Sequence, residues 1–256
     1  MVTNKRKRRI NPLQIIIGYT IGMLMILAGV YLATLTPVGP LSEALPYMES
    51  DKQVTVTHEK YAFIQPAGSP AKIGLIVYPG GRVDYRSYAP LARGLAEKGW
   101  PVAIIPMPLN LAVLGADRAS WVIHDHPEIQ SWVIGGHSLG GTMAAQYALK
   151  NPGEFVGIIF MASFPDGKNL AASKISVLSI YGSEDGLIKM DEWQKYQDRF
   201  PSTTRWVKIE GGNHAGFGWY GKQEGDNPAS ISLEDQTGQI IQAVDEFMRT
   251  VENSQE

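Results

Sequence analysis

The sequence predicts an α/β fold, in which helices cover both faces of a doubly wound, mostly parallel β-sheet. Strand-like apolar runs alternate with helical runs along most of the chain, which is the pattern of such a sheet. The middle strands are continuously apolar, as expected where both faces of a sheet are buried. About 200 residues follow the first 53, enough for one domain with a substantial core.

The expected elements follow the chain in order. Strands are expected over residues 54–64, 73–78, 101–105, 132–134, 156–161, 177–181 and 205–209. Helices are expected over residues 88–98, 139–150, 190–200 and 236–251. The connection over residues 162–174 is too short to form a lid, so no cap domain is expected.

A serine stands between a predicted strand and a predicted helix. The apolar residues 132–134 lead into Gly-Gly-His-Ser-Leu-Gly-Gly at 135–141. A sharp bend crowds the backbone, so the positions two before and two after the serine must be small, and here they are Gly136 and Gly140. The pattern favours Ser138 as a nucleophile presented at the bend. The alternative is a serine that only caps the helix.

A serine nucleophile needs a histidine as its base, and the chain has 5 histidines. His214 follows the predicted strand at 205–209, within a glycine-rich loop, where a base is needed. The other four fit less well, because they lie in an edge strand, in a polar loop or beside the serine: His58, His124, His126 and His137.

A carboxylate must orient that histidine, and the loop after residues 175–181 offers two. We favour Asp185, whose short side chain stands next to a glycine, and Glu184 is the fallback. Asp191 lies at the start of a predicted helix, where a role at the helix dipole explains it better. The order Ser138, Asp185, His214 places each residue after a predicted strand.

Backbone amides that stabilise a developing oxyanion should come from two places. One is Leu139, directly after the serine, and the other is Gly81, in the loop after residues 73–78, with Arg82 as the alternative. A plain tight turn also explains that loop. Further candidates for contact with a substrate are Arg82, His137, and two aromatic residues of the 217–228 segment that could equally pack onto the body, Trp219 and Tyr220.

These motifs resemble the α/β-hydrolase superfamily, and within it the compact lidless branch of dienelactone hydrolase-like esterases. The segments that carry the likeness are 78–81, 136–141, 181–185 and 211–214, and it extends over residues 54–250. The resemblance implies the α/β-hydrolase fold and a Ser-Asp-His triad. Dienelactone hydrolases proper use a cysteine nucleophile and this chain has none, so the lactone substrate does not carry over.

The function we expect is hydrolysis of a small-molecule carboxylic ester through an acyl-enzyme intermediate. A thioesterase or acyltransferase would use the same triad, and a peptidase would cleave amides as well. A third class is a non-catalytic, membrane-tethered binding domain that keeps the fold. The substrate and the oligomeric state are not determined by the sequence.

The N-terminus carries a second signal. Basic residues at 5–9 precede an apolar segment at 13–35, and no charged residue follows until Glu43. That length suits a transmembrane helix. The basic residues predict a cytoplasmic N-terminus (1–12), an uncleaved signal anchor, and a catalytic domain outside the cytoplasm. A cleaved signal peptide is the competing interpretation. Residues 36–53 are expected to form a spacer, and the hydrolase-like domain to span 54–256.

Charge and composition restrict the expected partners. The chain has 23 basic and 25 acidic residues, and without the five basic residues at 5–9 the balance is clearly acidic. Nucleic acid is therefore not an expected partner. No metal or organic cofactor is expected, because no cluster of histidine and carboxylate residues has useful spacing, and His124 and His126 come nearest. The absence of cysteine excludes disulfides and lipid attachment through a lipoprotein cysteine.

Overall fold

A computed structural model describes residues 12–34, 36–68, 71–166, 170–188 and 190–255. Two compact units are distinguished, residues 1–36 and residues 37–256. Helix α1 (Pro12–Thr34) belongs to the first unit, and its large apolar side chains between residues 16 and 27, and that of Tyr31, are exposed.

The predicted membrane anchor over residues 13–35 is not supported by the structure. Among the residues described, no helix combines the length and the apolar character that crossing a membrane requires. The basic run at 5–9 lies outside the described residues. The topology inferred from that run stays a prediction.

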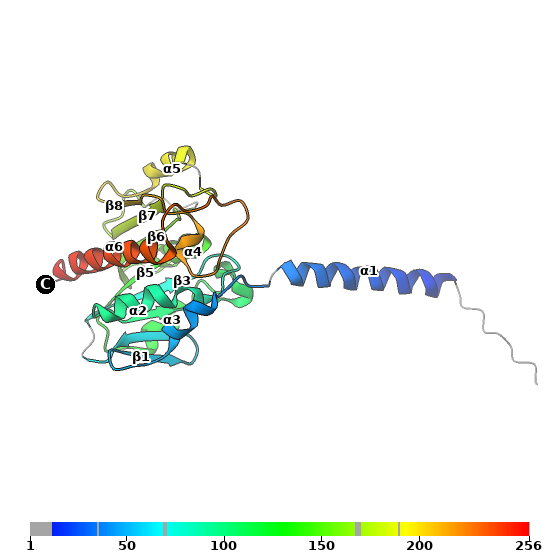
Figure 1. The fold of residues 1–256 in the computed structure, drawn as a ribbon, viewed down its shortest axis with the longest axis horizontal. Coiled ribbons are helices and arrows are strands. Elements are labelled where there is room, and N and C mark those ends of the chain that lie inside the picture. The colour runs from blue at the N-terminus through cyan, green and yellow to red at the C-terminus, as the bar shows by residue number, and fades with distance from the viewer. Residues whose placement is uncertain (1–11, 35, 69–70, 167–169, 189, 256) are drawn as a thin grey trace, which may run out of the picture. The chain divides into compact units, whose positions relative to one another are not determined.

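The second unit contains an 8-stranded sheet in the order β1-β2-β4-β3-β5-β6-β7-β8 (Figure 1). From β4 to β8 all neighbouring strands are parallel, while β1 and β2 form an antiparallel hairpin that pairs with β4. The strands are β1 (Val54–His58), β2 (Ala62–Pro66), β3 (Ile73–Tyr78), β4 (Val102–Ile104), β5 (Ser131–His137), β6 (Phe155–Met161), β7 (Ser176–Gly182) and β8 (Arg205–Ile209). The predicted mostly parallel sheet is confirmed.

Two apolar cores lie on opposite faces of this sheet. Alternate residues of β3 show the division, since Leu75 and Val77 belong to one core and Ile76 and Tyr78 to the other. The first core also includes residues of α2 (Ala89–Glu97) and α6 (Leu233–Asn253). The second includes residues of α3 (Ala119–Asp125) and α4 (Leu139–Lys150). Helices therefore cover both faces, as the continuous hydrophobicity of the strands predicts.

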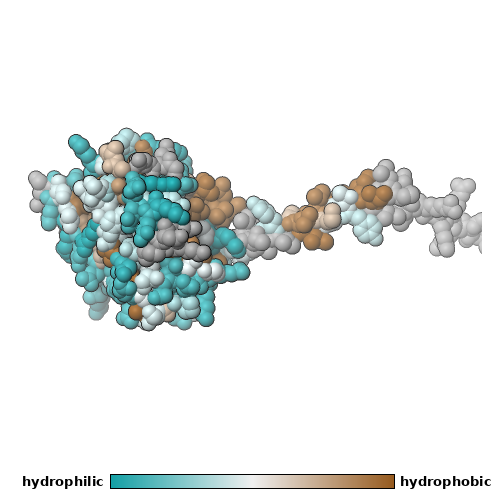
Figure 2. Space-filling view, turned by 90° about the horizontal axis from the view of Figure 1, so that it is seen from above, coloured by the Kyte–Doolittle hydropathy of each residue, from teal (hydrophilic) through white to brown (hydrophobic). Residues whose placement is uncertain are grey.

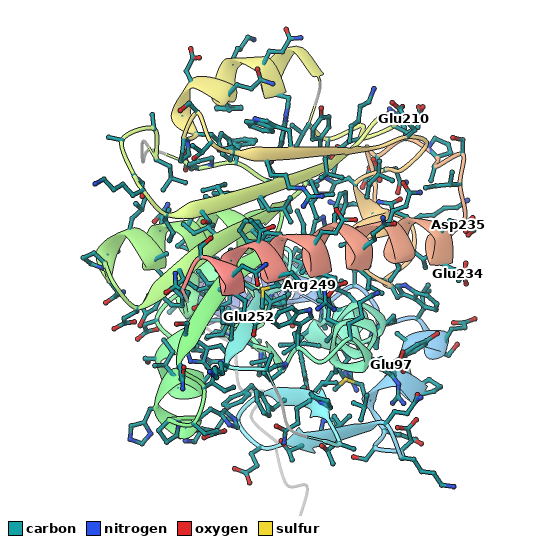
Figure 3. The ribbon with its side chains drawn as sticks, turned by 90° about the vertical axis from the view of Figure 1, so that its left-hand side faces the viewer. Glu97, Glu210, Glu234, Asp235, Arg249 and Glu252 are labelled. Carbon is teal, nitrogen blue, oxygen red and sulfur yellow. The ribbon has the colours of Figure 1, made fainter. Side chains whose placement is uncertain are left out.

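Helix α6 lies across its face of the sheet (Figure 3). Its N-terminus is capped by Ser232, whose hydroxyl accepts a hydrogen bond from the Asp235 amide, and Glu234 and Asp235 in the first turn suit the helix dipole. Trp100 donates its indole N–H to Asp245 of this helix at 2.7 Å, which joins α6 to the segment that precedes β4.

Several predicted boundaries differ from the structure. The predicted strand at 54–64 is the β1–β2 hairpin, and α3 was not predicted. The predicted helix at 190–200 is α5 (Met190–Tyr196) followed by a 3-10 turn. Between β6 and β7, the described residues 162–166 and 170–175 contain no helix or strand, consistent with the predicted lack of a cap.

The predicted spacer at 36–53 is not a separate linker. A 3-10 helix, Ser42–Met48, buries Ala44 and Met48, and Val38 forms a β-bridge with Val83. From Pro37 onward this segment therefore packs as part of the second unit. Most of the visible surface of that unit is hydrophilic, with apolar residues gathered in a few places (Figure 2).

Candidate active site

The predicted site residues follow the carboxyl ends of four parallel strands. Gly81 follows β3, Ser138 follows β5, Asp185 follows β7 and His214 follows β8. Parallel strands present these ends at one edge of the sheet, which is where open α/β sheets bind their ligands. Because β7 and β8 are neighbours, the loops of Asp185 and His214 lie side by side.

Ser138 occupies a sharp bend between β5 and α4. Its φ of 51° and ψ of −122° lie outside the regions that non-glycine residues favour, at a cost of about 1–3 kcal/mol. A Cβ on Gly136 would lie 2.6 Å from the Tyr78 carbonyl oxygen, and one on Gly140 would overlap the carbonyl oxygens of Tyr78 and Pro79. Both glycines are therefore required by the close approach of the β3 backbone.

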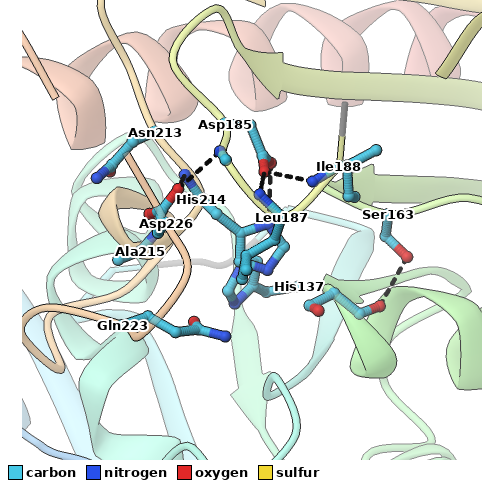
Figure 4. Close-up of polar contacts among 12 residues, drawn as sticks. His137, Ser163, Asp185, Leu187, Ile188, Asn213, His214, Ala215, Gln223 and Asp226 are labelled. Atoms are coloured by element: carbon cyan, nitrogen blue, oxygen red, sulfur yellow. Dashed lines mark hydrogen bonds and ion pairs between the residues drawn. The ribbon is translucent and has the colours of Figure 1, made fainter. Parts of the chain in front are cut away.

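Two hydrogen bonds hold the bend. The Ser138 amide donates to the Met161 carbonyl at 3.0 Å, and the Ser163 hydroxyl donates to the Ser138 carbonyl at 2.7 Å. Figure 4 shows the second contact as a dashed line from Ser163. Both partners come from the end of β6, so the neighbouring strand fixes the backbone that presents the serine. Ser163 was not identified from the sequence.

Asp185 and His214 form a buried pair. The distance from His214 Nδ1 to Asp185 Oδ2 is 2.9 Å, and the two side chains are 2% and 4% exposed, respectively. The other carboxylate oxygen, Oδ1, accepts hydrogen bonds of 2.8 Å from the amides of Leu187 and Ile188. An ionised carboxylate can only accept, so this network assigns the proton to His214 Nδ1 and leaves the Nε2 lone pair available.

The fallback carboxylate has a different partner. Glu184 accepts a long hydrogen bond of 3.5 Å from the Ser183 hydroxyl. Among the described residues it makes no hydrogen bond or ion pair with His214. The geometry therefore favours Asp185.

The predicted nucleophile and the predicted base are neighbours that share no hydrogen bond in the described part of the chain. Among the described residues, no hydrogen bond joins Ser138 Oγ to His214, and His214 Nε2 is buried without a partner. The ring of His137, the residue before the serine, lies 4.6 Å from the His214 ring, centroid to centroid. The predicted base thus lies beside the bend at Ser138, and such contacts often tighten only when substrate binds.

The two residues whose amides are expected to stabilise an oxyanion are neighbours in the structure. A Cβ on Gly81 would be 3.3 Å from Leu139 Cδ2. Within the described part of the chain, neither the Gly81 nor the Leu139 amide donates to a protein acceptor. The Arg82 amide, in contrast, donates to the Asn110 carbonyl at 2.7 Å. Gly81 is therefore the better of the two predicted donors.

Three of the four predicted substrate contacts are buried. His137 is 1% exposed, Trp219 6% and Tyr220 4%. Trp219 donates its indole N–H to Thr237, and Tyr220 donates its hydroxyl to Gln223. Trp219 thus packs the 217–228 segment onto α6, which is the second of the two alternatives for its aromatic residues. Contact of these side chains with a substrate stays a prediction. Arg82 is exposed, with a φ of 64°.

Tyr88, a buried tyrosine that was not identified from the sequence, contacts two residues of the site. The Tyr88 hydroxyl accepts a hydrogen bond from the Gly80 amide and contacts His137 Nδ1, both at 2.8 Å. Burial raises the pKa of the Tyr88 phenol. Burial, and then the proximity of His214, hold the pKa of His137 well below its usual range. We therefore assign a neutral His137 whose Nδ1 accepts a hydrogen bond from the Tyr88 hydroxyl.

The residues considered for a metal do not converge. His124 contacts Asp125 at 3.2 Å, and His126 contacts Glu128 at 2.9 Å. Within the part of the chain that the structure describes, no group of three histidine, cysteine, aspartate or glutamate residues is placed to hold a metal ion.

Comparison with known proteins places the chain in a family. Residues 74–238, more than half of the chain, match the model of the alpha/beta hydrolase family. With the sheet and the strand-to-helix bend, this match shows that the chain belongs to the alpha/beta hydrolase family and is a hydrolase by family. A search of curated proteins found no match.

Solved structures share the fold at low identity. A dienelactone hydrolase from Anabaena variabilis is 16% identical, with a TM-score of 0.57, covering 77% of this chain and 98% of its own. A predicted CIB-like hydrolase from Thermoplasma acidophilum is 14% identical, with a TM-score of 0.55, covering 75% and 99%. An alpha-beta serine hydrolase homologue from Coxiella burnetii is 14% identical, with a TM-score of 0.53, covering 75% and 97%.

Proposed function

We propose that this protein is a serine hydrolase that cleaves small carboxylic esters. Ser138 Oγ attacks the ester carbonyl carbon while His214 Nε2 takes the hydroxyl proton, and Asp185 holds His214 in the tautomer that can accept it. The amides of Leu139 and Gly81 stabilise the oxyanion of the tetrahedral intermediate. As that intermediate collapses, His214 gives the proton to the alkoxide, and an alcohol leaves.

The second half of the reaction returns the enzyme to its resting state. Water attacks the Ser138 ester carbonyl, and His214 removes a proton from that water. A second tetrahedral intermediate then collapses, the proton returns to Ser138 Oγ, and the carboxylic acid is released. No other co-reactant is needed.

The observation that carries this proposal is the buried Asp185–His214 pair beside a strained serine. The 2.9 Å hydrogen bond and the two amides on Asp185 Oδ1 determine which imidazole nitrogen can act as a base. The backbone strain at Ser138 persists only because β3 and β6 hold the bend. We include formation of the Ser138–His214 hydrogen bond on substrate binding in the proposal.

Pre-steady-state kinetics with short-chain nitrophenyl esters test this proposal. A burst of nitrophenol in proportion to enzyme, followed by slower turnover, is expected for an acyl-enzyme. The Ser138→Ala variant should fold with a similar melting temperature and show no burst. If folded wild-type protein hydrolyses none of a panel of oxygen esters, the ester substrate is wrong. If it instead turns over thioesters with the same burst, the triad is retained and the protein is a thioesterase.

A further inference from the structure

The segment that follows the His214 loop contacts the loops of both Asp185 and His214. Residues 218–231 connect the 3-10 turn at Ala215–Phe217 to α6. Trp219 and Tyr220 fix the beginning of this segment by packing inside the molecule. Its later part returns to the candidate site, and there the carboxylate of Asp226 contacts the backbone of two loops.

A tight turn presents this carboxylate. The Asp226 amide donates to the Gln223 carbonyl at 3.2 Å, and Gly225 within the turn has a φ of 86°, which favours glycine. The Gln223 side chain accepts a hydrogen bond from the Tyr220 hydroxyl at 2.8 Å. The turn is therefore anchored to the packed part of the segment, and Asp226 has a defined position.

The Asp226 carboxylate joins the loops of the predicted acid and the predicted base. Its Oδ1 accepts hydrogen bonds from the Gly186 amide at 2.9 Å and the His214 amide at 3.3 Å, and its Oδ2 accepts one from the Ala215 amide at 2.8 Å (Figure 4). Gly186 directly follows Asp185. One side chain thus contacts the backbone beside the acid and the backbone of the base itself.

The backbone next to Asp226 also lies close to the loops of Asp185 and His214. A Cβ on Gly186 would lie 2.6 Å from the Asn227 amide nitrogen. The Asn213 side chain donates to the Asn227 carbonyl at 2.7 Å. On the sheet side of the pair, the two loops already contact one another, since the Glu184 amide donates to the Gly212 carbonyl at 2.8 Å. Asp226 adds a second connection between the two loops, at Gly186 on one and at His214 and Ala215 on the other.

We infer that Asp226 is a positioning residue, which sets the spacing of the acid and base loops and so keeps the Asp185–His214 hydrogen bond in catalytic geometry. This inference rests on the proposed hydrolase function. Hydrogen bonds from backbone amides to a carboxylate are stronger than those between neutral groups, so one side chain suffices to hold both loops. A misplacement of about 1 Å at such a pair can cost about 10²-fold in rate.

Substitution of Asp226 tests the inference in the full-length protein. Asp226→Ala removes the connections to Gly186, His214 and Ala215, and we expect kcat on nitrophenyl acetate to fall about 10²-fold with KM little changed. In Asp226→Asn, the side-chain oxygen can still accept from Gly186 and His214, but the NH₂ group faces the Ala215 amide, so that two donors meet. We therefore expect a smaller loss in kcat, of about tenfold. Asn227→Ala is the matched control, because Asn227 makes its contacts through backbone atoms, and its kcat should stay near that of the wild type.

Rates are divided by the fraction of enzyme that a fluorophosphonate titrates, so partial unfolding does not imitate a loss of positioning. The low-field proton resonance of His214 Nδ1–H should broaden or shift in the Asp226 variants and not in Asn227→Ala. If wild-type protein is active and both Asp226 variants keep its kcat per titrated site, the positioning role is wrong. If Asp226→Ala does not fold, Asp226→Asn decides the question alone. An inactive, unlabelled wild-type protein overturns the proposed function, and an unchanged Nδ1–H resonance in the Asp226 variants still overturns the positioning role.

Discussion

Asp185→Asn tests whether the carboxylate selects the histidine tautomer. In the native protein, Asp185 Oδ1 accepts from the amides of Leu187 and Ile188, both at 2.8 Å. An asparagine can satisfy two amide donors only with its carbonyl oxygen, so its NH₂ group must face His214 Nδ1. That nitrogen must then accept, and the imidazole proton moves to Nε2. Nε2 can no longer take the proton of Ser138.

The expected loss in kcat is about 10⁴-fold, which corresponds to about 5.4 kcal/mol in the activation free energy. The fold should change little, because asparagine has the same shape and keeps the two amide hydrogen bonds. Replacing a charged by a neutral acceptor weakens these bonds by about 1–2 kcal/mol. The melting temperature should therefore fall by about 2–8 °C.

The assay is steady-state hydrolysis of nitrophenyl acetate, with the melting temperature of each variant measured alongside. Glu184→Gln is the matched control, since Glu184 contacts Ser183 rather than His214. It should keep a kcat close to that of the wild type. The tautomer mechanism is refuted if Asp185→Asn keeps more than about a tenth of the wild-type kcat. A large loss in Glu184→Gln would instead point to the fallback carboxylate.

Three further predictions concern stability. Gly140→Ala should lower the free energy of unfolding by about 1–3 kcal/mol, because its Cβ would overlap the carbonyl oxygens of Tyr78 and Pro79. A Cβ on Gly238 in α6 would meet no atom within 4 Å, so Gly238→Ala should raise the free energy of unfolding by up to about 1 kcal/mol. Thermal melts in which the two variants shift the melting temperature equally would contradict the packing of the bend. The pKa of His137 lies below its usual value, so its buried neutral ring stabilises the fold above about pH 6.5, and this contribution is lost as the pH falls below that value. Melting temperatures from pH 8 to pH 5 should therefore fall more steeply for wild type than for His137→Gln, and equal slopes would show that His137 is not the group responsible.

The features that the sequence predicts well are those with a local steric cause. The bend at Ser138 could be predicted because Gly136 and Gly140 must be small, and the structure shows which carbonyl oxygens impose this. Asp185 and His214 could be placed because each follows a strand of a parallel sheet. Their 2.9 Å contact depends on the pairing of β7 with β8, which no local pattern contains.

Other features were missed because their signal is weak or nonlocal. The turn between β1 and β2, at residues 59–61, is Glu-Lys-Tyr, without the glycine, proline or asparagine that marks turns. Helix α3 is short, contains two β-branched residues and has no side-chain cap. The burial of Trp219 depends on Thr237 of α6, which lies 18 residues further along the chain. Tyr88 and Asp226 contact residues far from them in the sequence, so nothing in the local sequence indicated these contacts.

The most direct test of the central claim is to map the fluorophosphonate adduct by mass spectrometry. We predict one adduct per molecule, on the peptide that contains Ser138. Labelling should be lost in Ser138→Ala and strongly slowed in His214→Ala, with both variants folded. Labelling of a different residue, or none in folded wild-type protein, would contradict the assignment of Ser138 as the nucleophile.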